Sequence, residues 1–105
     1  MNWAMERAVI PIAEYYGLDH QLGLLQEECG ELVQAISKYH RYHDMGLLIE
    51  EIADVEVVIA QIKYLLGEKE RNAIHSVEGM KIARTKQRIA ERRCDGDSCP
   101  IGGKE

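Results

Sequence analysis

The segment from Leu47 to Leu66, "LLIEEIADVEVVIAQIKYLL", most constrains the fold, because it is apolar on two sides of a helix. At about 100° per residue, one stripe of side chains contains Ile52, Val55, Ile59, Ile62 and Leu66. A second stripe on the far side contains Ala53, Val57, Ala60 and Tyr64. A helix that is apolar on two sides is buried on two sides. We therefore expect one side to pack within the chain and the other against a second chain.

The N-terminal half predicts two further helices. The first spans about residues 3–16, is disturbed in its middle by Pro11, and is ended by Gly17. Asp19 is the expected N-cap of the second. Its apolar positions recur at helical spacing, and Cys29 among them is expected to be a small core residue: Leu22, Leu25, Cys29, Leu32, Val33 and Ile36.

The remaining boundaries follow from breaks and caps. The segment "YHRYHDMG" (39–46) interrupts the periodicity, and Asp44 is a suitable N-cap for a helix over about 45–66 that Gly67 ends. A last helix is predicted over about 73–92, and we find no strand signal. We expect an all-α fold, built as an antiparallel helical hairpin or bundle of about four helices.

The length of 105 residues suits a single small domain, expected over residues 1–93. Residues 94–105, "CDGDSCPIGGKE", are rich in Gly, Asp and Ser and predict a flexible tail. Cys94 and Cys99 in this tail offer a second, weaker candidate for a metal site. Small domains bury a smaller share of their surface, so we expect a homodimer or a homotetramer.

Composition excludes several classes of function. The net charge of −5 argues against general nucleic-acid binding. No apolar run reaches the roughly 20 residues that span a bilayer, so no membrane association is expected. The N-terminal residues lack the uninterrupted apolar core of a secretory signal, and three cysteines are an odd number for a disulfide framework. We expect reduced thiols and a cytoplasmic protein.

The charges are distributed unevenly along the chain. Residues 8–62 contain ten acidic residues and only two strong cations, Lys38 and Arg41. Residues 63–93 contain nine Lys or Arg and four Glu. An acidic half followed by a basic helix suits a site for a metal and a phosphate, although solvated helix faces would give the same pattern.

Two acidic boxes stand out within the acidic half. "EECGE" (27–31) and "EEIAD" (50–54) each place two carboxylates at i, i+3 on one helix face. Each i, i+4 like-charge pair costs on the order of 0.2–0.5 kcal/mol, so a function is needed to retain them. In an antiparallel hairpin centred near Arg41, Glu31 is level with Glu51 and Glu28 is level with Asp54. The four carboxylates can then converge on one pocket.

Four converging carboxylates cannot all stay ionised without a cation. Ligation by oxygen alone favours a hard ion, Mg²⁺ or Mn²⁺, over zinc. A di-iron carboxylate site needs Glu-x-x-His on two helices, which this chain does not have. The alternative is an acidic face exposed to solvent.

The double motif E-E-x-x-E, a gap, then E-E-x-x-D, with 19 residues between Glu31 and Glu51, resembles the MazG-like all-α nucleoside triphosphate pyrophosphohydrolases. The resemblance covers about residues 18–92. It implies cleavage of a nucleoside triphosphate to a monophosphate and pyrophosphate. It also implies that Mg²⁺, held by Glu28, Glu31, Glu51 and Asp54, binds the phosphates and activates a water. Glu27 and Glu50 would be outer groups or the general base.

Candidates for substrate binding lie on both sides of the boxes. Lys81, Arg84 and Arg88 share one face of the last helix, where the family has a Lys-rich patch with an Asn, but Thr85 stands where that Asn is expected. An exposed basic face is the alternative. Lys38 lies two turns after Glu31 and is a further phosphate-binding candidate. Gln21 lies two turns before Glu28 and can reach a nucleobase edge, and three aromatic residues can stack on a base or simply pack: Trp3, Tyr39 and Tyr42.

We therefore expect a Mg²⁺-dependent enzyme that hydrolyses an NTP or dNTP to NMP and pyrophosphate and so cleans the nucleotide pool. Two alternatives remain open. One is a phosphoribosyl-ATP pyrophosphohydrolase, and the other is a non-enzymatic helical adaptor that retains the acidic boxes.

Overall fold

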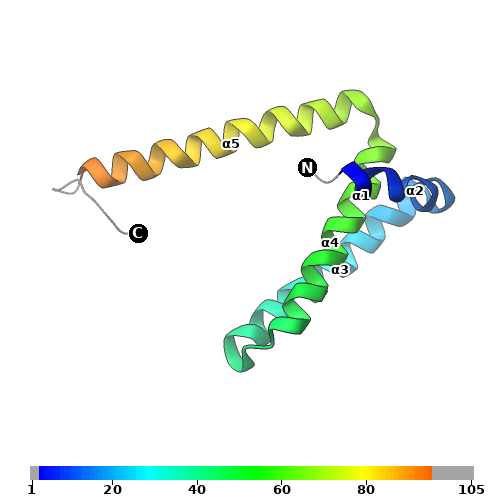
Figure 1. Ribbon diagram of the computed structural model, residues 1–105, viewed down its shortest axis with the longest axis horizontal. Helices are drawn as coiled ribbons and strands as arrows, with labels where there is room; N and C mark the ends of the chain where they lie inside the picture. The colour runs from blue at the N-terminus through cyan, green and yellow to red at the C-terminus, as the bar shows by residue number, and fades with distance from the viewer. Residues whose placement is uncertain (1–2, 96–105) are drawn as a thin grey trace. The chain divides into compact units, whose positions relative to one another are not determined.

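The computed structural model describes residues 3–95, and this part of the chain is almost entirely helical (Figure 1). It contains no strand within these residues, so the all-α prediction is confirmed. Its helices are α1 (Trp3–Ala8), α2 (Ile10–Tyr16), α3 (Leu18–Tyr42), α4 (Met45–Leu66) and α5 (Glu68–Asp95). None of them is long and apolar enough to cross a membrane. The predicted tail begins with the last two residues of α5, and its residues 96–105 lie outside the described residues.

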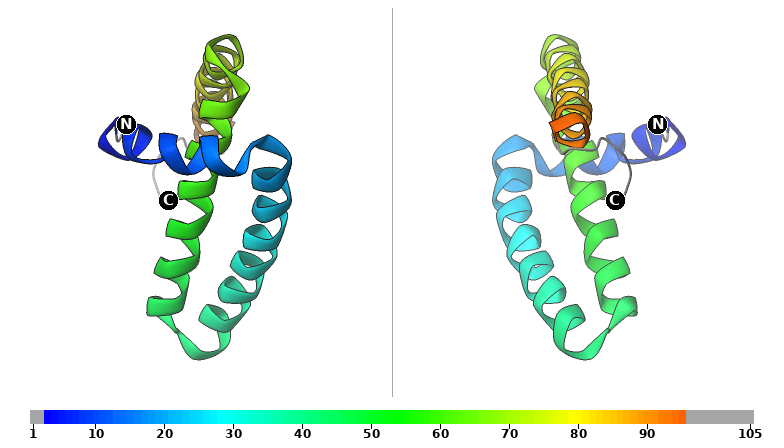
Figure 2. Two further views of the ribbon diagram at one scale, coloured as in Figure 1. Left: turned by 90° about the vertical axis from the view of Figure 1, so that its right-hand side faces the viewer. Right: turned by 90° about the vertical axis from the view of Figure 1, so that its left-hand side faces the viewer.

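The chain divides into two compact units, one of residues 1–71 and one that begins at Asn72. In the first unit α3 and α4 form an antiparallel hairpin, and α1 and α2 pack against it at the end opposite the turn (Figure 2). In the second unit the described residues are the continuation of α5, in which almost every side chain is exposed.

The helix boundaries differ from the predicted ones in three places. The first predicted helix is two helices separated at Val9, because Pro11 stands in the first turn of α2, where its missing N–H is not needed. Asp19 is not the N-cap of α3, since that helix begins at Leu18 directly after Gly17, which has a φ of 85°. The last helix begins at Glu68 rather than near residue 73, because Gly67 (φ 102°) already turns the chain.

The N-cap of α4 was predicted correctly, whereas the break predicted over residues 39–46 is confined to His43 and Asp44. Asp44 is the N-cap of α4, and its carboxylate accepts a hydrogen bond of 3.0 Å from the backbone N–H of Leu47. His43 ends α3 in the left-handed conformation, with a φ of 58°. Two residues therefore separate α3 from α4, and this short connection makes the helices antiparallel neighbours.

The seam between α3 and α4 has an unusual composition. On α3 the buried residues are Gln21 and Ala35, which are fourteen residues apart, and Glu28 midway between them is half-buried. On α4 the buried residues include Glu51, Val58 and Gln61. The prediction that Cys29 is a small core residue is wrong for this chain, because Cys29 is exposed. In the first apolar stripe of α4, Ile52 and Ile59 are exposed whereas Ile62 is buried. Three polar side chains are among the buried residues of the two helices: Gln21, Glu51 and Gln61.

The apolar residues displaced from the seam form one exposed face, which we call the apolar face. Val33 is 63% exposed on α3 and Ile49 is 61% exposed on α4. Leu22, Ile36 and Ile52 each directly follow a buried residue, so they are displaced by roughly 100° from the seam and lie on the same side of an antiparallel pair. Val33 and Ile49 are turned further from the seam, by about 160°. The apolar face consists of Leu22, Val33, Ile36, Met45, Ile49 and Ile52.

The second side of α4 is partly covered within the chain. α1 and α2 both contact α4, and Ala60 and Ile62 are buried near its C-terminal end. Tyr64 adds a polar contact, because its hydroxyl donates a 2.6 Å hydrogen bond to the Glu14 carboxylate of α2. The C-terminal half of α4 is therefore covered in part by the chain's own N-terminal helices, and the expectation that one side of α4 packs against a second chain stays a prediction.

Candidate metal centre

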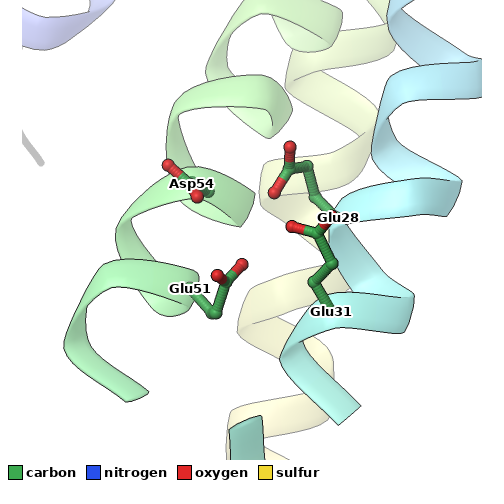
Figure 3. Close-up of side chains that lie close together, drawn as sticks. All are labelled: Glu28, Glu31, Glu51 and Asp54. Atoms are coloured by element: carbon green, nitrogen blue, oxygen red, sulfur yellow. The ribbon is translucent and has the colours of Figure 1, made fainter. Parts of the chain in front are cut away.

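Four carboxylates meet in the middle of the hairpin. Glu28 and Glu31 come from α3, Glu51 and Asp54 come from α4, and their side chains point toward one another (Figure 3). One oxygen from each lies within 4.8 Å of one oxygen from every other. The structure thus brings together the four residues that the two acidic boxes were predicted to contribute.

The register of the hairpin explains this convergence. The antiparallel pairing of α3 with α4 brings the two acidic boxes beside each other, although the turn lies at His43 and Asp44 and not at Arg41, from which the boxes are equidistant. Within each helix the i, i+3 spacing places both carboxylates on one face. The pairing of the helices and the spacing within each box together account for the cluster.

The cluster is partly removed from water. Glu51 is the most buried of the four, with 9% of its surface exposed, while Glu28 and Asp54 are half-buried and Glu31 is exposed. One carboxylate oxygen of Glu28 and one of Glu51, Oε1 in both cases, are buried and have no hydrogen-bond partner among the described residues. A buried oxygen without a donor is costly, so both atoms need a partner.

The pKa values of Glu28 and Glu51 also indicate that the cluster needs a cation. Burial raises the pKa of Glu28 above its ordinary value, and the negative charges of Glu31, Asp54 and Glu51 raise it further. Burial is also the main cause that raises the pKa of Glu51, followed by the charges of Glu31 and Asp54. Both shifts mean that the ionised cluster is unfavourable until positive charge enters it.

The donor set fits a hard divalent cation. Carboxylate oxygens are the ligands that Mg²⁺ prefers, at distances of about 2.0–2.1 Å, which places opposite ligands of an octahedral ion about 4 Å apart. Oxygens that lie within 4.8 Å of one another need only small side-chain rotations to reach this arrangement. The two orphaned Oε1 atoms would then gain the partner that the protein does not supply.

Glu27 and Glu50 precede the cluster on their helices and are both exposed. The charge of Glu50 contributes to the raised pKa of Glu51, which shows that it acts on the cluster electrostatically. Their assignment as outer groups or as the general base remains a prediction.

The predicted substrate-binding residues fall into three groups. Lys38 is exposed on α3, two turns beyond Glu31. Lys81, Arg84 and Arg88 are exposed on α5, in the second unit of the chain. Gln21 differs from all of these, because it is 1% exposed and both polar atoms of its amide lack a hydrogen-bond partner among the described residues.

The aromatic candidates are packed or exposed on the turn side of the cluster. Tyr39 is half-buried, and its ring lies edge-on to that of His43 with 5.3 Å between centroids. Tyr42 is 70% exposed, with the Arg41 guanidinium 5.5 Å from the ring centroid. The side chains of Trp3 and Cys94, and all of Cys99, lie outside the described residues.

Sequence reasoning missed Gln61. It is 4% exposed on α4, and its Oε1 has no hydrogen-bond partner among the described residues. A signal was present, because a glutamine stands inside the apolar run "VVIAQIKYLL". Gln61 follows Asp54 by seven residues, as Gln21 precedes Glu28 by seven residues.

Comparisons of the chain with protein-family models, with curated proteins and with solved structures found no match.

Proposed function

We propose that the chain is a Mg²⁺-dependent nucleoside triphosphate pyrophosphohydrolase that converts an NTP or dNTP to NMP and pyrophosphate. The observation that carries this proposal is the convergence of four carboxylates from two helices, with two buried oxygens that have no partner. The resemblance of the two acidic boxes to those of MazG-like enzymes supports the same activity. Mn²⁺ has the same ligand preference and is a suitable substitute.

Glu28, Glu31, Glu51 and Asp54 would hold the metal. When bound, Mg²⁺ neutralises the polyphosphate, lowers the pKa of a water and orients in-line attack. The protein's own residues supply the remaining steps. A carboxylate oxygen of Glu27 or Glu50, both exposed beside the cluster, accepts the proton of the attacking water. Lys38, which is exposed on α3 two turns beyond Glu31, supplies positive charge for the phosphates.

The proposed active species is a homodimer or a homotetramer. The buried hydrophobic side chains of the described residues are few and mostly small: Val9, Ala13, Ala35, Val58, Ala60 and Ile62. The apolar face offers larger side chains, including Val33, Ile49 and Ile52, that a second copy would cover. Glu31 and Asp54 lie on the opposite side of the seam from the apolar face, so association there leaves the carboxylates accessible.

The test is pyrophosphate release from a panel of ribo- and deoxyribonucleoside triphosphates with Mg²⁺, comparing the wild type with Glu28→Gln and Glu56→Gln. Glu56 is exposed on α4 and is outside the cluster, so its variant controls for the loss of one charge. We expect metal-dependent release by the wild type and by Glu56→Gln, and none by Glu28→Gln. Release that is equal in all three proteins would contradict the proposal.

Two other results would select the alternatives. Turnover of phosphoribosyl-ATP without turnover of free triphosphates would identify the other pyrophosphohydrolase. A folded protein that hydrolyses no nucleotide, and whose melting temperature does not respond to Mg²⁺, would be a helical adaptor.

A further inference from the structure

Two buried amides in the hairpin seam have no part in the metal cluster. Gln21 is 1% exposed and Gln61 is 4% exposed. Nε2 and Oε1 of Gln21, and Oε1 of Gln61, have no hydrogen-bond partner among the described residues. Buried amides are normally satisfied, because a buried polar atom without a partner costs free energy. Two such side chains in one seam indicate that something else completes their hydrogen bonds.

The two amides continue the line of the carboxylates. Gln21 precedes Glu28 by seven residues, and Gln61 follows Asp54 by seven residues. Seven residues are close to two helical turns, so each amide lies on the same face of its helix as the carboxylate, roughly 10 Å further along. Because the carboxylates of the two antiparallel helices converge, a step of two turns from the cluster on each helix brings Gln21 and Gln61 to the same end of the hairpin. The seam therefore contains the carboxylate cluster and, two turns away, the two amides of Gln21 and Gln61, which we call the amide level.

We propose that Gln21 and Gln61 bind the hydrogen-bonding edge of the nucleobase of a ligand whose phosphates lie at the carboxylate cluster. This inference rests on the proposed function and deepens it. A carboxamide presents a donor and an acceptor side by side, which matches the adjacent donor and acceptor groups on a base edge. The separation between the carboxylate cluster and the amide level suits the span from the phosphates of a nucleotide to its base. The ligand class is thus a nucleotide rather than an inorganic polyphosphate or a sugar pyrophosphate.

α2 lies at the same end of the hairpin as the two amides, and this sets a condition on binding. It contacts both α3 and α4, and Figure 2 shows it lying across the end of the hairpin opposite the turn. Only Ala13 of its seven residues is buried, and the hydrogen bond from Tyr64 to Glu14 ties it to α4. Entry of a base requires this short helix to move, and a helix with so little buried surface is easily displaced.

The experiment compares a ligand with a base and a ligand without one. Binding of ribo- and deoxyribonucleoside monophosphates and of inorganic tripolyphosphate, all with Mg²⁺, is measured by titration calorimetry. The proteins are the wild type, Gln21→Leu, Gln61→Leu and the control Gln26→Leu, which changes an exposed glutamine of the same helix. Gln21→Met and Gln61→Met, which conserve side-chain volume better, replace any leucine variant that does not fold.

We expect each of the Gln21 and Gln61 variants to weaken binding of the preferred monophosphate by about tenfold or more, since the base edge loses a partner. Tripolyphosphate binding should stay within about twofold of the wild type, and Gln26→Leu should change neither ligand. The inference fails if no monophosphate binds, if both ligands weaken equally, or if the amide variants bind nucleotides as the wild type does.

The outcome for the proposed function is separate. If the amide variants lose nucleotide binding selectively but the wild type cleaves no triphosphate, the base site stands and the hydrolase assignment fails. If the wild type releases pyrophosphate but the variants show no base-dependent loss, the hydrolase stands and the base site fails.

Discussion

Replacement of Glu51 by Gln should have opposite effects with and without Mg²⁺. Glu51 is the most buried carboxyl of the cluster, its Oε1 has no partner, and three other carboxylates surround it. Without metal, the neutral amide removes a repulsive charge, so we expect the melting temperature of Glu51→Gln to exceed that of the wild type. With metal, the variant lacks one ligand and should lose most of the stabilisation that Mg²⁺ gives.

The size of the Mg²⁺ effect follows from linkage. At a Mg²⁺ concentration of about one hundred times its Kd, a ligand that binds only the folded state stabilises it by about 2.7 kcal/mol. The unit that contains the cluster comprises residues 1–71, and in domains of this size 1 kcal/mol shifts the melting temperature by about 4–8 °C. The wild type should therefore melt about 10–20 °C higher with saturating Mg²⁺.

Differential scanning calorimetry with EDTA or with Mg²⁺ measures both effects, and Glu56→Gln is the matched control on the same helix. The control should keep the full Mg²⁺ shift. If Glu51→Gln melts below the wild type in EDTA and keeps the same Mg²⁺ shift, the carboxylates neither repel one another nor hold the ion, and the reasoning is refuted.

Four further outcomes follow from the same structure. Burial and neighbouring charges raise the pKa values of Glu28 and Glu51 above 4.5, so the stability that their protonation contributes is fully present below pH 4.5 and is lost as the pH rises through the raised values. The melting temperature in EDTA should therefore fall as the pH rises through this window, and the increase in melting temperature on adding Mg²⁺ should become larger. An increase that does not vary with pH would contradict this expectation. Asp44→Ala removes the cap that begins α4 and should cost about 0.5–2 kcal/mol in urea unfolding, whereas an unchanged midpoint would show that the cap is dispensable. Ala35→Leu enlarges a fully buried seam residue, so it should cost about 1–3 kcal/mol and weaken Mn²⁺ binding in a titration; tighter binding would refute the seam packing. Ile49→Lys places a charge on the apolar face and should reduce the mass measured by light scattering to that of a monomer, and an unchanged oligomer would locate the interface elsewhere.

The hairpin and its cluster were predictable because local signals fix them. Asp44 caps α4, the short connection of His43 and Asp44 makes α3 and α4 antiparallel neighbours, and the acidic boxes lie at similar distances on either side of it. The i, i+3 spacing then leaves little freedom for Glu28, Glu31, Glu51 and Asp54. Helical periodicity likewise predicted α4 within its observed bounds, Met45–Leu66.

The buried face of each helix was not predictable in the same way. Periodicity identified two apolar stripes on α4 and placed Cys29 in the core, whereas Cys29 is exposed and the buried residues include Glu51 and Gln21. Apolar pattern alone cannot tell a surface that packs within one chain from a surface left for another molecule. Gln61 was missed because its only signal is its position inside an apolar run, and a single polar residue adds nothing to the periodicity.

The most direct test of the metal-centre account is ³¹P nuclear magnetic resonance of the products that the wild type forms from its preferred nucleoside triphosphate. The account predicts that a nucleoside monophosphate and pyrophosphate appear together only when Mg²⁺ or Mn²⁺ is present, and that Glu28→Gln forms neither. Formation of a diphosphate and inorganic phosphate, or turnover that persists in EDTA, would contradict it.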